Sequence, residues 1–334
     1  MIRHLLLWGS LAATLPGADL TTTIDRGLAS LTRLQGADGS FHDQGIPIAA
    51  TALAGMAYLA GGHTPNRGQY RLASQKCLTS VLGRQDPATG YLGAGDGGRM
   101  YAHGFATLYL AEVYGMTSDG AVRRALEAAV DCIHRSQNRE GGWRYNPVPE
   151  DADISVTICQ VMALRAANNA GIGGTASQDA IGRAVAYVRR CANGDGSFAY
   201  VAGGGFAGGG PEGVPRAAAG VMCLIGAGIT DPGDATLGPA LRFLATNAPL
   251  HLRQAPGQHY FWYGQYYTAQ ALFHHPDPAA WDAYWAAAAP IIASHQGAQG
   301  LWTAAESPGG PAYATAMALI ILQIPNHYLP IFQR

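Results

Sequence analysis

The sequence predicts an all-α protein, an (α/α)6 toroid in which an outer ring of helices surrounds an inner one. Three observations lead to this prediction. A turn in which a glutamine is followed by a glycine and, six residues after the glutamine, by an aromatic residue recurs at intervals of roughly 40 to 60 residues. A stretch with polar residues on one side at helical spacing comes before the turn, as in a solvent-facing helix. A nearly wholly apolar run follows it, which is typical of a helix buried on all sides.

The turn is recognisable six times along the chain. Glycine in the turn permits the reversal of the chain, and the aromatic residue is expected to stack beside the glutamine of its unit. The clear copies are QGADGSF at 35–41, QDPATGY at 85–91, QNREGGW at 137–143 and QGAQGLW at 296–302, and the weaker ones are ANGDGSF at 192–198 and QAPGQHY at 254–260.

The helices are expected in alternation, outer before inner, within one domain that covers residues 19–334. The clearest outer stretches cover 22–34, 70–82, 121–135 and 176–190. The inner runs cover 48–60, 101–114, 154–167, 216–228, 266–273 and 313–323. The closing segment NHYLPIFQR, rich in prolines and aromatics, suits an extended tail that lies across the ring and covers one of its mouths.

Composition narrows the class of protein further. The chain has 334 residues, 48% of them hydrophobic and 13% charged, with a formal net charge of −1. That composition excludes a disordered chain, which would be highly charged and poor in apolar residues. The near-neutral net charge and the lack of a basic patch argue against a nucleic-acid partner.

The N-terminus has the layout of a secretory signal peptide over residues 1–18. Arg3 and His4 precede an apolar run that ends near Leu15, and the small residues Gly17 and Ala18 follow. The run is too short to cross a bilayer, and no other segment resembles a transmembrane helix. We therefore expect export to the periplasm or the outside of the cell, with a plain N-terminal helix of a cytoplasmic protein as the alternative.

Polar and aromatic residues gather where the inner helices are expected to begin. Because these helices start on the same side of the ring, their first residues face one shared mouth, where a pocket for a small-molecule or lipid-like ligand is expected. Asp153 directly precedes an apolar run and is also a good helix N-cap, and His103 is also compatible with a core histidine. The candidates around this mouth are Tyr101, His103, Trp143, Tyr145, Asp151, Asp153, Arg216, His259, Tyr260, Trp262, Tyr263, Tyr266, Tyr267 and Tyr313.

Arg216 follows a proline at an expected helix start, where the helix dipole disfavours a cation. A carboxylate or an anionic ligand is therefore expected to hold it.

The recurring turn resembles the QW-type repeat of the terpene cyclase and protein prenyltransferase toroids. The chain as a whole resembles bacterial proteins with prenyltransferase/squalene-oxidase repeats, through segments such as GGWRYNPVPEDADISVT and HYFWYGQYYTAQALF. The resemblance covers nearly everything after residue 20 and implies the toroid fold, whereas the family name describes a repeat and establishes no activity.

Class II terpene cyclases place an Asp-x-Asp-Asp motif at an inner-helix start, and Asp151-Ala152-Asp153-Ile154 is similar to its first two acids. The resemblance implies that Asp153 protonates a linear isoprenoid, with Asp151 beside it and His103 as the orienting partner. Trp143, Tyr145, Trp262, Tyr263 and Tyr267 would then stabilise the carbocations of a cyclisation. Ile154 stands where the third acid of the motif is expected.

Two other functions stay open at this point. An exported polysaccharide lyase or glycoside hydrolase could use His103, Tyr263, Tyr266 and Arg216, or the carboxylate pair Asp151 and Asp153. A toroid without catalytic activity could bind a lipid, glycan or peptide in the same mouth. Protein prenyl transfer is disfavoured because the Asp-x-Cys pair that holds its zinc is missing, and no motif calls for a metal or nucleotide cofactor.

Overall fold

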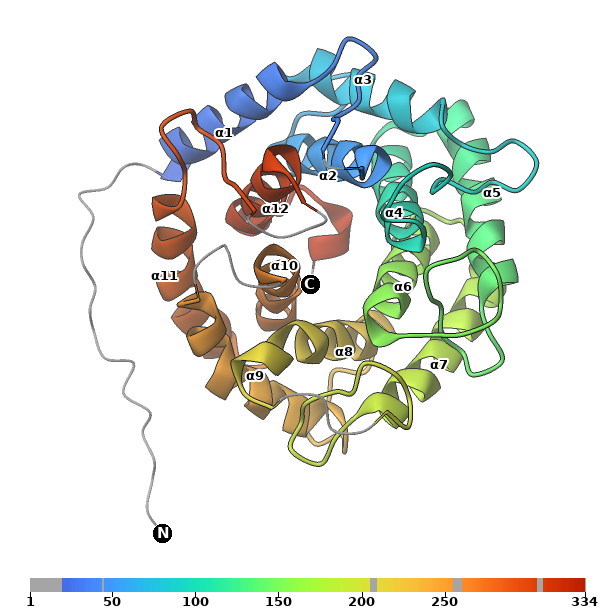
Figure 1. Cartoon of the computed structure of the whole chain (residues 1–334), viewed down its shortest axis with the longest axis vertical. Helices are drawn as coiled ribbons and strands as arrows, with labels where there is room; N and C mark the ends of the chain where they lie inside the picture. Colours follow the sequence, from blue (N-terminus) through green and yellow to red (C-terminus); the bar gives the residue numbers. More distant parts are fainter. Residues whose placement is uncertain (1–19, 44, 205–208, 255–259, 305–308, 334) are drawn as a thin grey trace.

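The computed structural model describes residues 20–43, 45–204, 209–254, 260–304 and 309–333, and within them it contains α-helices and short 3-10 turns. Residues 1–18, the predicted signal peptide, lie outside the described residues, as does His259. The helices form two concentric rings, which confirms the predicted toroid (Figure 1). None of the helices in these segments is long and apolar enough to cross a membrane.

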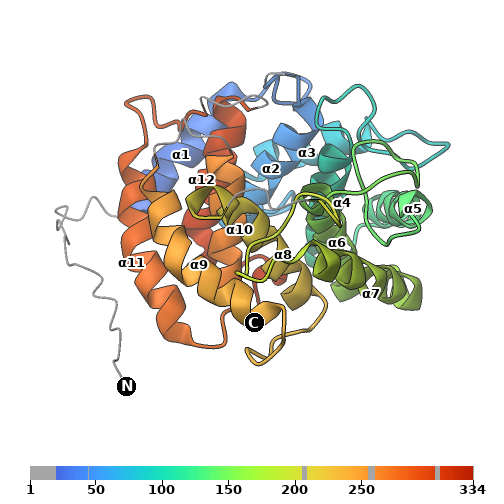
Figure 2. The ribbon, with the colours of Figure 1, turned by 60° about the horizontal axis from the view of Figure 1, so that its bottom comes forward.

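Outer and inner helices alternate along the chain, and Figure 2 shows α9 and α11 on the outside of α10 and α12. The outer helices are α1 (Leu20–Leu34), α3 (Arg71–Leu82), α5 (Gly120–Ser136), α7 (Gly174–Cys191), α9 (Leu237–Leu252) and α11 (Pro278–Ser294). The inner helices are α2 (Pro47–Ala60), α4 (Met100–Thr117), α6 (Ile154–Asn169), α8 (Val214–Gly226), α10 (Phe261–Phe273) and α12 (Pro311–Gln323).

Burial separates the two rings as the sequence pattern predicts. The inner helix α2 is buried along nearly its whole length, whereas the outer helix α5 buries one stripe and exposes the other. Each inner helix packs against the next, and contacts between α12 and α2 close the ring. The protein core is therefore the layer between the two rings together with the contacts inside the inner ring.

The glutamine of each clear turn fastens its unit to the next outer helix. Gln137 Nε2 donates to the carbonyl of Gly141 in its own turn, at 2.7 Å, and to the carbonyl of Ala180 on α7, at 2.8 Å. The corresponding pair of bonds is made by Gln35, Gln85 and Gln296. The last of these glutamines reaches α1, so the same device closes the outer ring.

The glycine of the turn is required for two reasons. Gly141 has a φ of +98°, and a Cβ at this position would lie 2.3 Å from the carbonyl oxygen of Arg183 on α7. A side chain would therefore meet both an unfavourable backbone conformation and a backbone atom that cannot move away. Positive φ combined with contact against the next outer helix recurs at Gly39, Gly90, Gly196 and Gly300.

The aromatic residue of the turn packs between the two helices of its own unit. Trp143 is buried, and its indole Nε1 donates to the carbonyl of Ile133 on α5 at 2.8 Å. Its backbone N–H donates to Thr157 Oγ1 on α6 at 3.1 Å. Trp302 forms the equivalent pair of bonds in the last unit. The turn thus fixes the spacing between the rings and the direction in which each inner helix begins.

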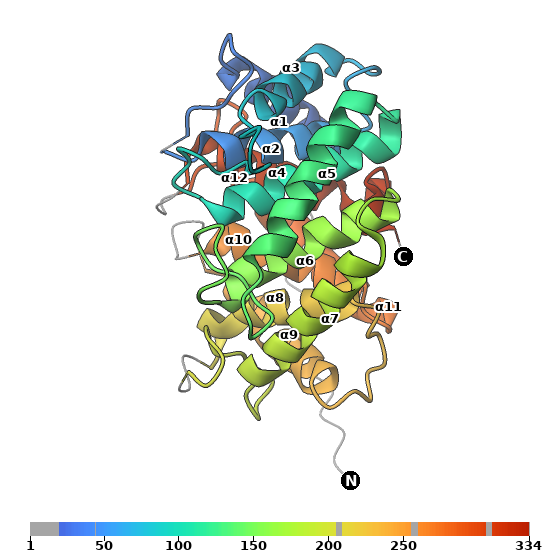
Figure 3. The same cartoon turned by 90° about the vertical axis from the view of Figure 1, so that its right-hand side faces the viewer.

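The tail after α12 crosses the ring on the side where the inner helices end. It forms two 3-10 turns, η2 (Ile324–Asn326) and η3 (Pro330–Phe332), and η3 packs against α4 and α6. Figure 1 shows this segment inside the ring, and Figure 3 shows it on the side opposite the loops that precede α6 and α8. The tail thus packs across one side of the ring as predicted, but with two 3-10 turns in place of the extended segment that was expected.

A buried glutamate on α4 contacts this tail, and its protonation should make the free energy of unfolding depend on pH. Glu112 on α4 accepts a bond from the N–H of Ile331 at 3.5 Å, and burial raises the pKa of Glu112 from its ordinary 4.5 to about 8. Between these pH values the folded protein keeps a proton that the unfolded chain releases. The free energy of unfolding contributed by this group is therefore fully present below pH 4.5 and is lost as the pH rises through about 8.

We expect Glu112→Gln to flatten this decline, because glutamine stays neutral at every pH. Urea unfolding at several pH values measures the free energy of unfolding of both proteins. Each unit of pKa difference between the folded and unfolded states corresponds to about 1.4 kcal/mol of this free energy. Burial also raises the pKa values of Asp43, Asp96 and Asp153, so part of the slope should remain. Glu127→Gln on α5 is the control, at a side chain that is 45% exposed and paired with Arg123, and an equal effect of both variants on the pH dependence would contradict the assignment.

Candidate functional site

The mouth at which the inner helices begin is built from loops that cap neighbouring helices. Asp96, in the loop before α4, accepts a bond from the N–H of Ile48 at the start of α2, at 2.6 Å. Asp43, before α2, accepts one from the N–H of Tyr313 on α12, also at 2.6 Å. Each carboxylate satisfies amides that the first turn of a helix leaves unpaired. Each loop is thereby held against the preceding unit of the ring.

Two further loops are held by backbone carbonyls, and these loops carry the candidate site. The carbonyl of Tyr145 accepts a bond from the N–H of Met100 at the start of α4, at 3.1 Å. The carbonyl of Tyr200 accepts one from the N–H of Ile154 at the start of α6, at 3.0 Å. These bonds hold the two loops at the starts of α4 and α6, and the hydroxyls of the two tyrosines meet each other.

Asp153 is the N-cap of α6. Its Oδ1 accepts bonds from the N–H of Val156, at 2.8 Å, and from the Ser155 hydroxyl, at 2.6 Å. The side chain is fully buried, so the capping interpretation of this residue is confirmed. Its backbone N–H also donates to the carbonyl of Trp143, which ties the cap to the turn of the same unit.

The second oxygen of Asp153 has no hydrogen bond of regular geometry. It lies 3.6 Å from Nε of Arg144, whose positive charge favours the carboxylate form of Asp153. The nearby hydroxyl of Tyr200 favours that form as well, although its regular hydrogen bond is with Tyr145. Burial outweighs these contacts and the bonds to Oδ1, and it raises the pKa of Asp153. A buried carboxyl group with a raised pKa and one oxygen outside any regular hydrogen bond is suited to hold a proton.

Arg144 connects this buried acid to an exposed one. Its Nη1 donates to Oδ2 of Asp151 at 2.7 Å, and this bond raises the pKa of the guanidinium. The side chain of Asp151 is 61% exposed, whereas that of Asp153 is fully buried. The guanidinium carbon lies 5.2 Å from the ring centre of Tyr145 and 5.8 Å from that of Tyr200. One arginine between two aromatic rings therefore bridges two carboxylates of different exposure.

A hydroxyl network extends from Asp153 to the edge of the mouth. The Ser155 hydroxyl, which donates to Asp153, is 2.5 Å from the hydroxyl of Tyr101. The hydroxyls of Tyr145 and Tyr200 are also 2.5 Å apart. Because Tyr101, Tyr145 and Tyr200 are all partly exposed, a ligand at the mouth would meet both their rings and their hydroxyl groups.

Tyrosines of α10 cross the inside of the ring, although α10 is not next to α6 or α4. Tyr263 donates to the carbonyl of Ser155 at 2.8 Å, and the hydroxyl of Tyr267 lies 3.3 Å from the sulfur of Cys159 on α6. The ring of Tyr266 meets that of Phe105 on α4 edge to face, with centres 6.0 Å apart. Tyr266 and Tyr267 are buried, so the space expected as an open central cavity is occupied at this level by tyrosine side chains.

His103 does not contact Asp153, and the expected orienting bond between them is wrong. Its Nδ1 accepts from the N–H of Leu92 at 3.1 Å, and its Nε2 lies 3.2 Å from the carbonyl of Ala129 on α5. Burial lowers its pKa to about 4, which fits a neutral ring with the proton on Nε2. His103 is a core histidine that joins α4 to the turn of its own unit, as Thr157 does for α6 in the third unit, and it also joins α4 to the next outer helix, α5.

The other predicted residues surround the mouth or lie below it. Trp143 is buried between α5 and α6 and does not line the mouth. Trp262 is buried, with its indole N–H on the carbonyl of Thr303. Half-buried Arg216 donates from Nε to the carbonyl of Phe198. Burial lowers the pKa of its guanidinium, and the negative charge of Glu212 opposes this effect. Tyr260 is exposed and Tyr313 partly buried, at the starts of α10 and α12.

Arg144, Ser155 and Tyr200 were not among the residues predicted from the sequence. Alignment of the repeats contains a signal for one of them, since Tyr200 follows Phe198 at the spacing by which Tyr145 follows Trp143. Nothing in the sequence shows that Arg144 reaches both aspartates. In the described segments, no group of three or more His, Cys, Asp and Glu side chains could hold a metal ion.

Comparison with known proteins shows the fold. No protein-family model matches the sequence, and no curated protein does. An α-1,6-mannanase of Salegentibacter, solved with α-1,6-mannotriose, is similar over 91% of this chain and 98% of its own, with a TM-score of 0.66 and 9% identity. The type II terpene cyclase MstE of Scytonema, with geranylgeranyl dihydroxybenzoate bound, is similar over 91% and 96%, with a TM-score of 0.62 and 14% identity. Both are α/α toroids.

Proposed function

We propose that this chain is a carbohydrate-active enzyme that hydrolyses a glycan held across the mouth at the start of α6. The observation that carries the proposal is the bridge made by Arg144 between buried Asp153 and exposed Asp151. Glycoside hydrolysis uses two carboxyl groups in different protonation states, one of which donates a proton to the leaving oxygen. Asp153, whose pKa burial raises, is the proton donor, and Asp151 is the second carboxylate.

The spacing of the two acids supports this assignment. Since both reach a single guanidinium, their nearest oxygens lie within roughly 9 Å, compatible with the range of about 5–10 Å found in glycoside hydrolases. Arg144 and Tyr200 cover Asp153 in this structure. The substrate must therefore displace the arginine from Oδ2 of Asp153 before the proton can be transferred.

The surroundings of the acids favour a hydroxyl-rich ligand. Partly exposed Tyr101, Tyr145 and Tyr200 offer ring faces and hydroxyls, and Arg144 and Asp151 add charged hydrogen-bonding groups. The tyrosines that fill the ring below the mouth favour a ligand that lies over the mouth. The similarity to a mannanase fits this proposal, as does the predicted export of the chain.

Acid-initiated cyclisation of a linear isoprenoid is the second candidate. The buried carboxyl group of Asp153 favours it, since a class II cyclase needs a protonated aspartate at an inner-helix start, and MstE shares the fold. This function would require Tyr263, Tyr266 and Tyr267 to move apart and open an enclosed cavity.

One experiment tests both candidates. The protein is incubated with neutral and acidic oligosaccharides, including α-1,6-linked mannose chains, and separately with linear isoprenoids. New reducing ends are measured in the first set and cyclised products by GC–MS in the second. With a glycan that is cleaved, Asp153→Asn and Asp151→Asn should each lose about 10²-fold or more in kcat.

Asp131→Asn, on the exposed side of α5, is the matched control and should leave the rate unchanged. Cyclised isoprenoids without any glycan cleavage would replace the first candidate by the second. Unchanged glycan turnover by Asp153→Asn would show that Asp153 is not the proton donor.

A further inference from the structure

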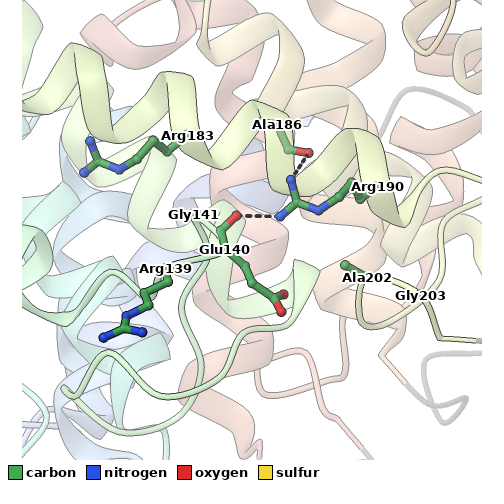
Figure 4. A pocket seen from close by; sticks show the side chains of 8 residues that line it. All are labelled: Arg139, Glu140, Gly141, Arg183, Ala186, Arg190, Ala202 and Gly203. Carbon is green, nitrogen blue, oxygen red and sulfur yellow. Dashed lines mark hydrogen bonds between the residues drawn. The ribbon is translucent and has the colours of Figure 1, made fainter.

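A second concave site lies beside the mouth, on the wall formed by α7 and the turn before α6. It is a hollow of about 630 Å³ whose charged lining residues are Arg139, Glu140, Arg183 and Arg190 (Figure 4). Within the described residues, none of its three guanidinium groups forms an ion pair with a carboxylate, whereas Arg123, Arg144 and Arg189 all do. Three unpaired cations around one hollow leave an excess of positive charge, because Glu140 is the single acid in its lining.

Two of these arginines are held in place by neutral groups. Arg190 donates from Nη1 to the carbonyl of Ala186 at 3.1 Å and from Nη2 to that of Glu140 at 2.6 Å, as Figure 4 shows, and it lies over the ring of Tyr187. Arg183 donates from Nε and Nη2 to Oε1 of Gln137. Fixed guanidinium groups with unused N–H donors and no bound carboxylate are preorganised for an anionic oxygen pair.

The hollow and the mouth are formed by the same two loops. One loop contributes Gly141 to the hollow and Arg144 to the mouth, and the other contributes Gly203 to the hollow and Tyr200 to the mouth. Three residues of extended chain span at most about 11 Å, so each loop brings the two sites within the length of a short oligosaccharide. A chain bound across the mouth and over these loops would reach the arginines.

We infer that the arginine hollow is a subsite for an acidic group of the polysaccharide, so that the substrate of the proposed function is an anionic glycan. This inference rests on the proposed function and names its substrate class. A carboxylate of a uronic acid and a sulfate ester share the required chemistry, a charged planar or tetrahedral group with several acceptor oxygens. The hollow thus selects for negative charge, whereas the mouth carries the two catalytic carboxyl groups.

Binding to the full-length protein tests the inference without any need for turnover. Isothermal titration with a polygalacturonate oligomer, a sulfated heparin-type oligomer and a neutral mannose oligomer is carried out at about 50 mM and about 200 mM salt. We expect at least one acidic oligomer to bind about tenfold or more tightly than the neutral one, and more weakly at the higher salt. The tighter acidic oligomer identifies the source of the anion.

Arg139→Glu is the decisive variant, since Arg139 is exposed and forms no hydrogen bond or ion pair within the described residues. It should weaken binding of the acidic oligomer by about tenfold or more and leave the neutral oligomer unaffected. Arg242→Glu, with the same charge change on the exposed side of α9, should change affinity less than about twofold.

Equal affinity for acidic and neutral oligomers, no binding of either acidic oligomer, or equal effects of the two arginine variants would overturn the inference. Tighter binding of a single-stranded nucleic acid than of any glycan would overturn it as well. The proposed function fails by a different result, unchanged turnover in Asp153→Asn. Loss of turnover in that variant with unaltered binding in Arg139→Glu would retain the function and reject the subsite.

Discussion

Alanine at position 141 should destabilise the protein by roughly 3–5 kcal/mol, far more than an ordinary glycine substitution. The left-handed backbone at φ +98° accounts for about 1–2 kcal/mol of this loss. The remainder arises because the new Cβ would lie 2.3 Å from the carbonyl oxygen of Arg183 and push the turn away from α7. That movement also stretches the two bonds by which Gln137 holds the outer ring, each worth about 0.5–1.5 kcal/mol.

Two other glycines provide matched controls for this prediction. Gly171 has a φ of +80° with no atom near its would-be Cβ, so Gly171→Ala should cost only the backbone term of about 1–2 kcal/mol. Gly182 lies within α7 in open space, and Gly182→Ala should stabilise by about 0.5–1 kcal/mol. Denaturant unfolding measures all three, and equal losses at positions 141 and 171 would show that the close contact carries no energy.

Removal of the tail after Gln323 should lower the melting temperature by about 10 °C or more, or prevent the protein from staying soluble. The tail buries Ile324, Leu329, Ile331 and Phe332, each about 1% exposed or less. Burial of such a side chain contributes about 1.5–3 kcal/mol, and the truncation also uncovers the ends of α4 and α6 on which the tail packs.

Point variants keep this prediction testable if the truncated protein does not fold. Phe332→Ala should cost about 3–5 kcal/mol, because it empties a buried site. Tyr328, in the same tail, is 50% exposed, and Tyr328→Ala should cost about 0.5 kcal/mol or less. A truncated protein with the melting temperature of the full chain would mean that the tail does not pack in solution as it does in this structure.

The repeat made the fold predictable because the residues of its turn make the same short-range contacts in each unit. The glutamine, the glycine and the aromatic residue of the turn contact their own unit or the next one, so the spacing in the sequence already defines the contacts. The alternation of one-sided and fully apolar helices then assigns each helix to a ring. The N-cap role of Asp153 followed from the sequence for the same reason, since Asp153 directly precedes its helix and bonds to an amide three positions away.

The candidate site could be predicted only in part. The sequence placed Asp151, Asp153, Tyr101, Tyr145 and Tyr263 at one mouth. In the structure the two acids and Tyr145 lie around Arg144, and Tyr101 and Tyr263 bond to Ser155 beside Asp153. It also predicted His103 at this site, where a bond to Asp153 was expected. The structure directs that ring to Leu92 and Ala129, because the inner helix of the second unit uses it to hold its own turn.

What the sequence determined by itself was therefore the ring, its six-fold repetition, the turn that fastens each unit and the tail that covers one side. What only the tertiary structure decided was which side chains meet across units, as in the contact of Tyr145 with Tyr200 or of Tyr267 with Cys159. The physical reason is the range of the interactions. Contacts within a unit follow from local geometry, whereas contacts across the axis depend on the diameter of the closed ring, which no single repeat encodes.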